Sequence, residues 1–344
     1  MGLGSKTLAE IESQPQLWTE ALRQFEQRAD ELQRLWSTTS FDEIIFTGCG
    51  STYYAGMVGA ALLQAGTGIT ARAVSATELM LFPEMIVSAH RTTLLICVSR
   101  SGTTRETVAA AEMFRNHGGH SIVVVTCSSE SPLAQTADVL VAIDAAQEES
   151  RVQTRSFSSM LLAVTALAAL FTGRDWRILA SMPERLERLT LASAETVERL
   201  GRDLSITQFV FLGSGALYGL ACEAMLKMTE MAKLFSAAYH PLEYLHGPHY
   251  TANATTQLIG LLSDGARAEE LRVFNILHGR GLALFTLSDA NRLLPVGGTV
   301  ITLDSDLPEW GRGLLYLPPL QRICWLQAVE RGFDPDNLAY RPQA

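Results

Sequence analysis

The chain has 344 residues, of which 47% are hydrophobic and 18% charged, and its formal net charge is −9. This length exceeds what one compact core usually serves, so we expect two lobes. The acidic balance, without a basic stripe, excludes nucleic acid as the main partner. A phosphorylated small molecule remains compatible, because a local nest of backbone N–H groups can hold it against the global charge.

The longest apolar run, Leu161–Phe171, is too short to span a membrane, and Met1–Ile11 lacks the layout of a secretory signal. We therefore expect no membrane partner. The odd number of scattered cysteines indicates reduced thiols in a cytoplasmic protein, not a disulfide framework or a metal site. They are Cys49, Cys97, Cys127, Cys222 and Cys324. We expect no cofactor.

The chain begins with a segment of helical apolar spacing, Thr7–Trp36, which predicts one or two leading helices. Short apolar runs that end in turns follow, alternating with helical segments. The predicted strands are Asp42–Thr47, Thr93–Val98, Ser121–Thr126 and Val139–Ile143. This alternation indicates a parallel sheet covered on both faces.

The same pattern then repeats after a long helical stretch from about 156 to 200. The second set of predicted strands is Gln208–Leu212, Leu258–Leu262, Leu282–Thr286 and Val300–Leu303. In each half the first strand runs into a Gly-x-Gly turn and a helix. The sequence therefore predicts an α/β fold of two tandem lobes, made by duplication of one unit, each a parallel sheet flanked by helices.

The segment Ser99-Arg100-Ser101-Gly102-Thr103-Thr104-Arg105-Glu106-Thr107 follows a strand and opens a helix. Ligands of open α/β sheets bind beyond the carboxyl ends of strands, and a helix N-terminus favours an anion. A simple helix cap is the alternative interpretation, but a cap needs one hydroxyl and four surround this glycine. The pattern therefore favours a phosphate site, with the hydroxyls as donors and Gly102 allowing close approach.

The equivalent loop of the second half is Ser263-Asp264-Gly265-Ala266-Arg267-Ala268-Glu269-Glu270, which has fewer hydroxyls and more acids. Carboxylates repel a phosphate. We expect one phosphate site per chain, in the first lobe.

Three charged residues of the second half, Glu223, Lys227 and Glu230, have spacings of i, i+4 and i+7, which places them along one helical face. A surface Glu–Lys pair is the ordinary interpretation. The residues between them are mostly apolar, so the helix is expected to be buried, and buried charges favour a polar pocket.

These motifs together resemble a known family. Gly48-Cys49-Gly50-Ser51-Thr52 and the loop after Ser99 resemble the SIS (sugar isomerase) phosphosugar-binding domain. The helix from Glu223 and the segment Ala238–Pro248, with Glu-x-x-His-Gly-Pro, resemble the isomerase half of glucosamine-6-phosphate synthase. They are also similar to stand-alone amino-sugar-phosphate deaminases/isomerases and fructosamine-6-phosphate deglycases, and Glu149–Phe157 is similar to the deaminase/isomerase branch.

The resemblance covers about residues 5 to 340 and implies two flavodoxin-like SIS lobes. It implies N-terminal helices at 1–37, a phosphate-binding SIS domain at 38–190, a second SIS domain at 191–333 and a tail at 334–344 over the active site. The residues that it implies for phosphate binding are Ser51, Thr52, Ser99, Arg100, Ser101 and Thr104.

The resemblance also implies catalytic roles. Glu230 falls on the base that moves a proton between C1 and C2, which suits a carboxylate, and Glu223 and Lys227 fall on further active-site positions. His246 falls on the residue that assists ring opening and that reaches in from the neighbouring subunit, so a homodimer with shared active sites is expected. A histidine suits this proton transfer, although a capping or core role is the alternative.

Two features limit these implications. His240 and His249 flank His246, but no carboxylate and cysteine arrangement completes a typical metal site, so we expect no metal. In the tail, Tyr340 stands where the synthase has a lysine, and tyrosine cannot form a Schiff base.

The sequence therefore predicts an enzyme, a phosphosugar-binding aldose–ketose isomerase/deaminase that acts on an amino-sugar 6-phosphate resembling glucosamine 6-phosphate. It would work by ring opening and C1/C2 proton transfer. The alternatives are a non-catalytic phosphosugar-binding or sensor protein and a fructosamine-6-phosphate deglycase.

Overall fold

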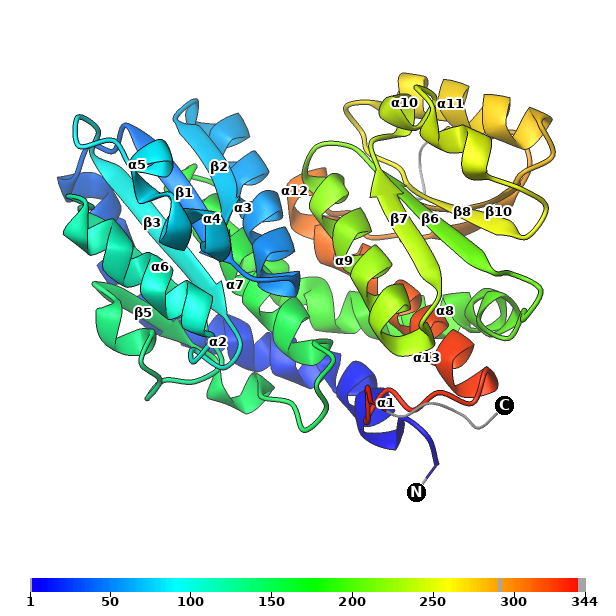
Figure 1. Cartoon of the computed structure of the whole chain (residues 1–344), viewed down its shortest axis with the longest axis horizontal. Coiled ribbons are helices and arrows are strands. Elements are labelled where there is room, and N and C mark those ends of the chain that lie inside the picture. Colours follow the sequence, from blue (N-terminus) through cyan, green and yellow to red (C-terminus); the bar gives the residue numbers. More distant parts are fainter. Residues whose placement is uncertain (1, 290–292, 340–344) are drawn as a thin grey trace. The chain divides into compact units, whose positions relative to one another are not determined.

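A computed structural model describes residues 2–289 and 293–339 and divides the chain into two compact units (Figure 1). The first lobe consists of residues 16–148 and 155–181. The second lobe consists of the described residues of 1–15, 149–154 and 182–344. In the described ranges, none of the helices combines the length and apolar composition that a membrane crossing needs.

The first lobe is built on a parallel sheet with the strand order β2-β1-β3-β4-β5. Its strands are β1 (Glu43–Gly48), β2 (Thr70–Ser75), β3 (Thr93–Ser99), β4 (Ser121–Thr126) and β5 (Val139–Ala142). Its helices are α2 (Gln14–Thr38), α3 (Ser51–Thr67), α4 (Ala76–Leu81), α5 (Pro83–Ile86), α6 (Arg105–Asn116) and α7 (Arg155–Phe171), with short 3-10 turns at Ala134–Thr136, Asp144–Ala146 and Trp176–Ser181. The central strands β1 and β3 are wholly buried, as expected for a parallel sheet covered on both faces.

The second lobe has a parallel sheet in the order β10-β9-β8-β6-β7. Its strands are β6 (Gln208–Gly213), β7 (Phe235–Tyr239), β8 (Thr256–Leu261), β9 (Ala283–Ser288) and β10 (Thr299–Thr302). Its helices are α1 (Ser5–Glu12), α8 (Met182–Gly201), α9 (Ala216–Ala232), α10 (Pro241–Tyr244), α11 (Arg267–Gly279), α12 (Glu309–Arg312) and α13 (Leu317–Glu330), with 3-10 turns at Pro248–Thr251 and Gly313–Tyr316.

The two sheets have the same topology, because reading each in chain order gives strands arranged 2-1-3-4-5. A constant offset of 165 residues relates β1 and α3 to β6 and α9, from Glu43 and Gln208 onward. Gly50 (φ 57°, ψ −124°) and Gly215 (φ 55°, ψ −129°) share a backbone conformation that side chains rarely adopt, so each turn requires glycine. The predicted fold of two tandem, duplicated α/β lobes is confirmed.

The prediction of four strands per lobe is wrong, because each sheet contains a fifth. The missed strands, β2 and β7, occupy equivalent positions at one edge of each sheet. Their residues are mostly half-exposed and include several alanines. An edge strand buries less side-chain surface than a central one, so these segments lack the continuous apolar run by which the other strands were recognised.

The first and last described residues of the chain and the segment 149–154 group with the second lobe, whereas the sequence analysis expects linear boundaries at 37, 190 and 333. The buried carboxylate of Glu10 on α1 accepts hydrogen bonds from the backbone N–H groups of Glu149 (2.6 Å) and Ser150 (3.2 Å). From the tail, Asp336 accepts from the N–H groups of Lys6 (2.9 Å) and Thr7 (2.8 Å). Asp336 thus caps the N-terminus of α1, which has no side-chain cap of its own.

Candidate active site

The loops that follow β1 and β3 lie at the point where the strand order of the first sheet reverses. In doubly wound folds this is where ligands bind, because two loops diverge there at the carboxyl ends of adjacent strands. The loop after β1 contacts the first turn of α6, the helix that follows the second loop, since the Cys49 thiol lies 3.6 Å from the Thr107 hydroxyl. The sequence-predicted phosphate residues of both loops are therefore brought to one edge of one sheet.

The loop after β3 is shaped by its own hydroxyls. The buried Ser99 hydroxyl accepts a hydrogen bond from the N–H of Gly102 (3.2 Å), and the Ser101 hydroxyl accepts from the N–H of Thr103 (3.2 Å). The side chain of Thr104, the residue before α6, makes no capping hydrogen bond. The helix-cap alternative is therefore wrong for Thr104, and the first turn of α6 keeps N–H groups that the helix cannot satisfy and that suit an anion.

The segment after β4 donates two backbone hydrogen bonds to the loop after β3. The N–H of Cys127 donates to the carbonyl of Arg100 (3.1 Å), and the N–H of Leu133 donates to the carbonyl of Gly102 (3.0 Å). Gly102 has a φ of +61°, and a Cβ atom there would lie 1.9 Å from the Ser131 hydroxyl. Only glycine meets both constraints.

Ser51 and Thr52 begin α3 and are buried. The Thr52 hydroxyl accepts from the N–H of Cys49 (3.0 Å) and donates to the carbonyl of the same residue (3.0 Å). Thr52 therefore closes the turn that brings Ser51 to the carboxyl edge of the sheet.

Arg100 has a partner that sequence reasoning missed. Its Nη1 atom lies 3.3 Å from a carboxylate oxygen of Glu148, a wholly buried side chain that also accepts from the N–H of Ser156 (3.3 Å). Glu148 thus links the guanidinium to the start of α7. No local motif indicated this pair, because the acid lies 48 residues after the arginine.

The counterpart loop in the second lobe is filled by the chain's own carboxylates. Glu270 accepts from the N–H (2.8 Å) and the hydroxyl (2.9 Å) of Ser263, and Glu309 accepts from the N–H of Asp264. Asp264 in turn is 2.6 Å from the guanidinium of Arg312, which is buried. Groups that could meet a phosphate are already satisfied here, which supports one phosphate site per chain.

The charged face of α9 is largely buried. The Lys227 Nζ atom lies 3.3 Å from Glu223 and 2.6 Å from Glu230, and the side-chain exposures are 1%, 0% and 31% respectively. The ordinary surface pair is thereby excluded. Of the two carboxylates only Glu230 reaches solvent, whereas Glu223 and Lys227 are buried.

The first lobe has no such charges at the equivalent positions. At the offset of 165 residues, Val58, Leu62 and Ala65 of α3 correspond to the three charged residues of α9. Around the α9 triad the setting is apolar, and burial raises the pKa of the Cys324 thiol on the adjacent helix α13. The charges are therefore a local feature of the second lobe, not a property of the repeated unit.

His246 is exposed and lies between α10 and Gly247, whose φ is +124°. Glu230 is near the end of α9, which returns to the amino edge of the sheet, where β7 begins. His246 follows the carboxyl end of β7, a strand of five residues or roughly 17 Å; α10 lies beyond the tip of this strand (Figure 1). In the described part of the chain no hydrogen bond or ion pair joins the two side chains.

Two further predictions concern the histidines and the tail. Among the described residues, no group of three or more His, Cys, Asp or Glu side chains could hold a metal ion. The ring of His240 stacks on Tyr218, with 3.9 Å between the ring centroids. Tyr340 lies outside the described residues.

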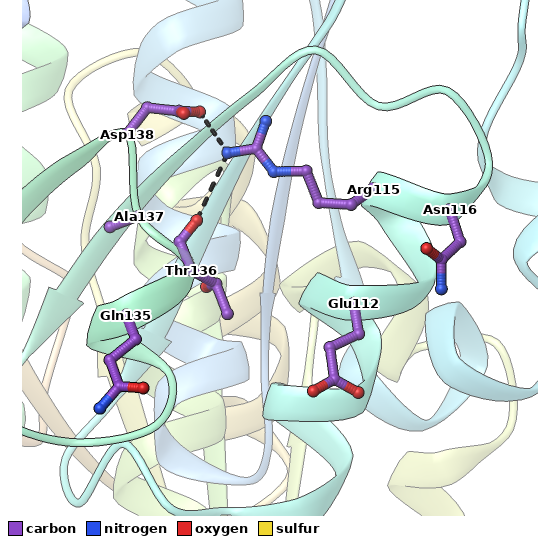
Figure 2. A pocket seen from close by; sticks show the side chains of 7 residues that line it. All are labelled: Glu112, Arg115, Asn116, Gln135, Thr136, Ala137 and Asp138. Atoms are coloured by element: carbon purple, nitrogen blue, oxygen red, sulfur yellow. Dashed lines mark hydrogen bonds and ion pairs between the residues drawn. The ribbon is translucent and has the colours of Figure 1, made fainter.

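A polar pocket of about 520 Å³ lies elsewhere on the first lobe (Figure 2). It is lined by Glu112, Arg115, Asn116, Gln135, Thr136, Ala137 and Asp138. Arg115 spans it and pairs with Asp138 at 2.6 Å. Because residues 135–138 precede β5, the pocket lies toward the amino edge of the sheet and is distinct from the loop after β3.

Fold and site together define a class, a duplicated flavodoxin-like α/β protein whose first lobe carries a hydroxyl-rich loop before helix α6. Comparison with known proteins places the chain within that class. The SIS domain model matches residues 39–173. This match covers most of the first lobe.

The chain is similar to isomerizing glutamine–fructose-6-phosphate aminotransferases. The protein from Pyrococcus horikoshii is 28% identical over 345 residues, which cover 96% of this chain and 56% of that protein. The protein from Pyrobaculum aerophilum is 29% identical, covering 86% of this chain and 50% of that protein. The chain thus spans about half the length of the curated relatives it matches.

Solved structures share the fold over nearly the whole chain. Tagatose-6-phosphate ketose/aldose isomerase from Escherichia coli has a TM-score of 0.89 at 23% identity, covering 97% of this chain and 95% of that one. Glucosamine-6-phosphate deaminase from Thermotoga maritima has a TM-score of 0.71 at 25% identity, covering 92% of this chain and 96% of that one.

Proposed function

We propose that this chain is an enzyme that interconverts the aldose and ketose forms of an amino-sugar 6-phosphate, with glucosamine 6-phosphate as the model substrate. The observation that carries the proposal is the partly exposed carboxylate of Glu230, held 2.6 Å from a buried lysine. A carboxylate in this setting suits proton transfer between adjacent carbon atoms.

The phosphate is assigned to the first lobe. The hydroxyls of Ser51, Ser99, Ser101 and Thr104 and the N-terminus of α6 supply donors for a dianion, and the helix dipole favours it. The Arg100 guanidinium, oriented by Glu148, adds positive charge beside the loop. Binding energy from the phosphate would hold the sugar for the chemistry at C1 and C2.

The chemistry is assigned to the second lobe. Glu230 takes the proton from C2 of the open-chain aldose and returns it to C1, while a second proton passes from the 2-substituent (the amine nitrogen of an amino sugar) to O1. With a 2-amino sugar this transfer yields an imine at C2, which water hydrolyses to the ketose and ammonia. Lys227 holds the Glu230 carboxylate, and Glu223 holds Lys227 from the buried side.

Ring opening is assigned to His246 of a second copy of the chain. Within one chain the edge that carries His246 is not the edge that carries Glu230, so joint action on one sugar would require two chains. The proposal is therefore a homodimer with shared active sites, as the resemblance implies.

The test is to incubate the protein with glucosamine 6-phosphate and follow ammonia and fructose 6-phosphate. We expect turnover by the wild type and a loss of at least about 1,000-fold in Glu230→Gln, because the amide cannot accept the proton. Glu195→Gln is the matched control, an exposed glutamate on α8. Turnover that survives in Glu230→Gln contradicts the assignment of the base.

The same assay separates the alternatives. Fructosamine 6-phosphate as the better substrate would indicate a deglycase. Phosphosugars that raise the thermal midpoint without any turnover would indicate a binding or sensor protein.

A further inference from the structure

The residue that ends α9 has an unusual backbone conformation. Lys233 has φ 56° and ψ 25°, the left-handed region, which is unfavourable for a residue with a side chain. At the equivalent position of the first lobe, 165 residues earlier, α3 ends at Gly68 with φ 73°. In the first lobe this helix thus ends in a glycine, which suits the left-handed conformation, and in the second lobe it ends in a lysine.

The lysine makes a contact that glycine could not make. Its Nζ atom donates to the backbone carbonyl of Glu230 at 2.6 Å. Carbonyls in the last turn of a helix have no partner within the helix, and such turns fray easily. Because its backbone is left-handed, Lys233 directs its side chain back over this turn and satisfies one of these carbonyls.

Two lysines therefore contact Glu230, one at its side chain and one at its main chain. Lys227 contacts its carboxylate from within the helix, and Lys233 contacts its main chain from beyond the helix end. The equivalent turn of the first lobe has Ala65 in place of Glu230 and glycine in place of Lys233. The strained lysine thus occurs in the lobe where a reactive carboxylate occupies the last turn, as expected when local strain serves a site.

We infer that Lys233 is a positioning residue that closes the last turn of α9 and so fixes Glu230 for proton transfer. This inference rests on the proposed function, because it gives Glu230 a reaction to be positioned for. A helix cap alone would not require lysine, since glycine ends a helix without strain.

The experiment compares Lys233→Gly, Lys233→Asn and Lys233→Arg with the wild type in the glucosamine 6-phosphate assay, together with thermal unfolding. Glycine and asparagine tolerate the left-handed backbone but cannot reach the carbonyl, whereas arginine can. We expect kcat to fall about 10- to 100-fold in the glycine and asparagine variants, with KM within about twofold. The thermal midpoint of Lys233→Gly should equal or exceed that of the wild type. The kcat of Lys233→Arg should stay within about threefold of the wild-type value.

Asp306→Gly is the matched control. Asp306 is another residue of the second lobe with positive φ (52°), and its side chain is 78% exposed. Relief of strain at this position should leave kcat unchanged. If Lys233→Gly matched the wild type in kcat, KM and thermal midpoint, Lys233 would do no more than end the helix. That result would overturn the inference and leave the proposed function intact. An inactive wild type would instead overturn both.

Discussion

Lys227 is an ammonium group placed between two carboxylates in the apolar interior of the second lobe. Burying a lone charge costs several kcal/mol, and pairing within one helix offsets that cost only when the partners are held closely. Glu223 and Glu230 provide this pairing from the preceding and following turns. Because the equivalent positions of α3 are apolar, the stability of the fold does not require the charges, and the proposed function gives them a chemical role.

The thiol of Cys49 provides a pH-dependent probe of the phosphate loops. Burial raises the pKa of this thiol above 9.0. The hydrogen bond with Thr107 acts in the opposite direction and lowers the pKa, and the nearby charge of Glu106 raises it further. The thiolate is the reactive form, so about 1% or less is reactive at pH 7. We expect slow alkylation by iodoacetamide at pH 7, acceleration as the pH rises through 9, and protection by glucosamine 6-phosphate.

Peptide mass mapping measures this modification residue by residue. Cys97 is the internal control, because burial raises its pKa to about 12 and it is fully enclosed. Rapid alkylation of Cys49 at pH 7 would contradict its raised pKa, and the same rate with and without ligand would contradict the placement of this loop beside the phosphate.

At the scale of elements, the same strand–loop–helix unit is used in two ways. In the first lobe, under the proposed function, the loop after β3 and the first turn of α6 bind the phosphate of the ligand. In the second lobe the carboxylate of Glu270 occupies the equivalent loop after β8 and bonds both donors of Ser263. An internal carboxylate thus takes the place that a phosphate oxygen would take.

Reciprocal substitutions test this difference between the lobes. Glu270→Ala leaves two buried donors of Ser263 without an acceptor, so the free energy of unfolding should fall by about 2 kcal/mol while the affinity for glucosamine 6-phosphate is unchanged. Ser101→Ala should do the opposite, weakening binding about tenfold and changing stability by under about 0.5 kcal/mol. Urea unfolding and calorimetric titration measure the two quantities, and calorimetry should give one site per chain. A stoichiometry of two would contradict the occupied second loop.

At the scale of the whole molecule, the second lobe separates Glu230 from His246 along the strand direction. If two chains complete each site, a mixture of Glu230→Gln and His246→Ala chains forms heterodimers with one intact site. Co-expressed variants should then recover about a quarter of the wild-type activity, since half of the random dimers are heterodimers. Each variant alone should be inactive. Heterodimers purified with two different affinity tags that show no activity would indicate sites within single chains.

The sequence alone was sufficient for the lobes, their duplication, the position of the hydroxyl-rich loop between β3 and α6, and the clustering of the α9 triad on one helical face. These features depend on local regularities: apolar runs with glycine turns, hydroxyls around Gly102, and charges at helical spacing on an apolar helix. The edge strands β2 and β7 were missed because their burial depends on a neighbouring strand, which composition does not reveal.

Only the tertiary structure decided which groups meet across long separations in the chain. Arg100 pairs with Glu148, and the tail residue Asp336 caps α1, each through contacts that side-chain spacing does not encode. The left-handed backbone of Lys233 is also a tertiary result, because the turn into β7 imposes a conformation that lysine does not prefer. Local pattern specifies which residues are candidates for the chemistry, whereas tertiary packing specifies the contacts that hold each of them.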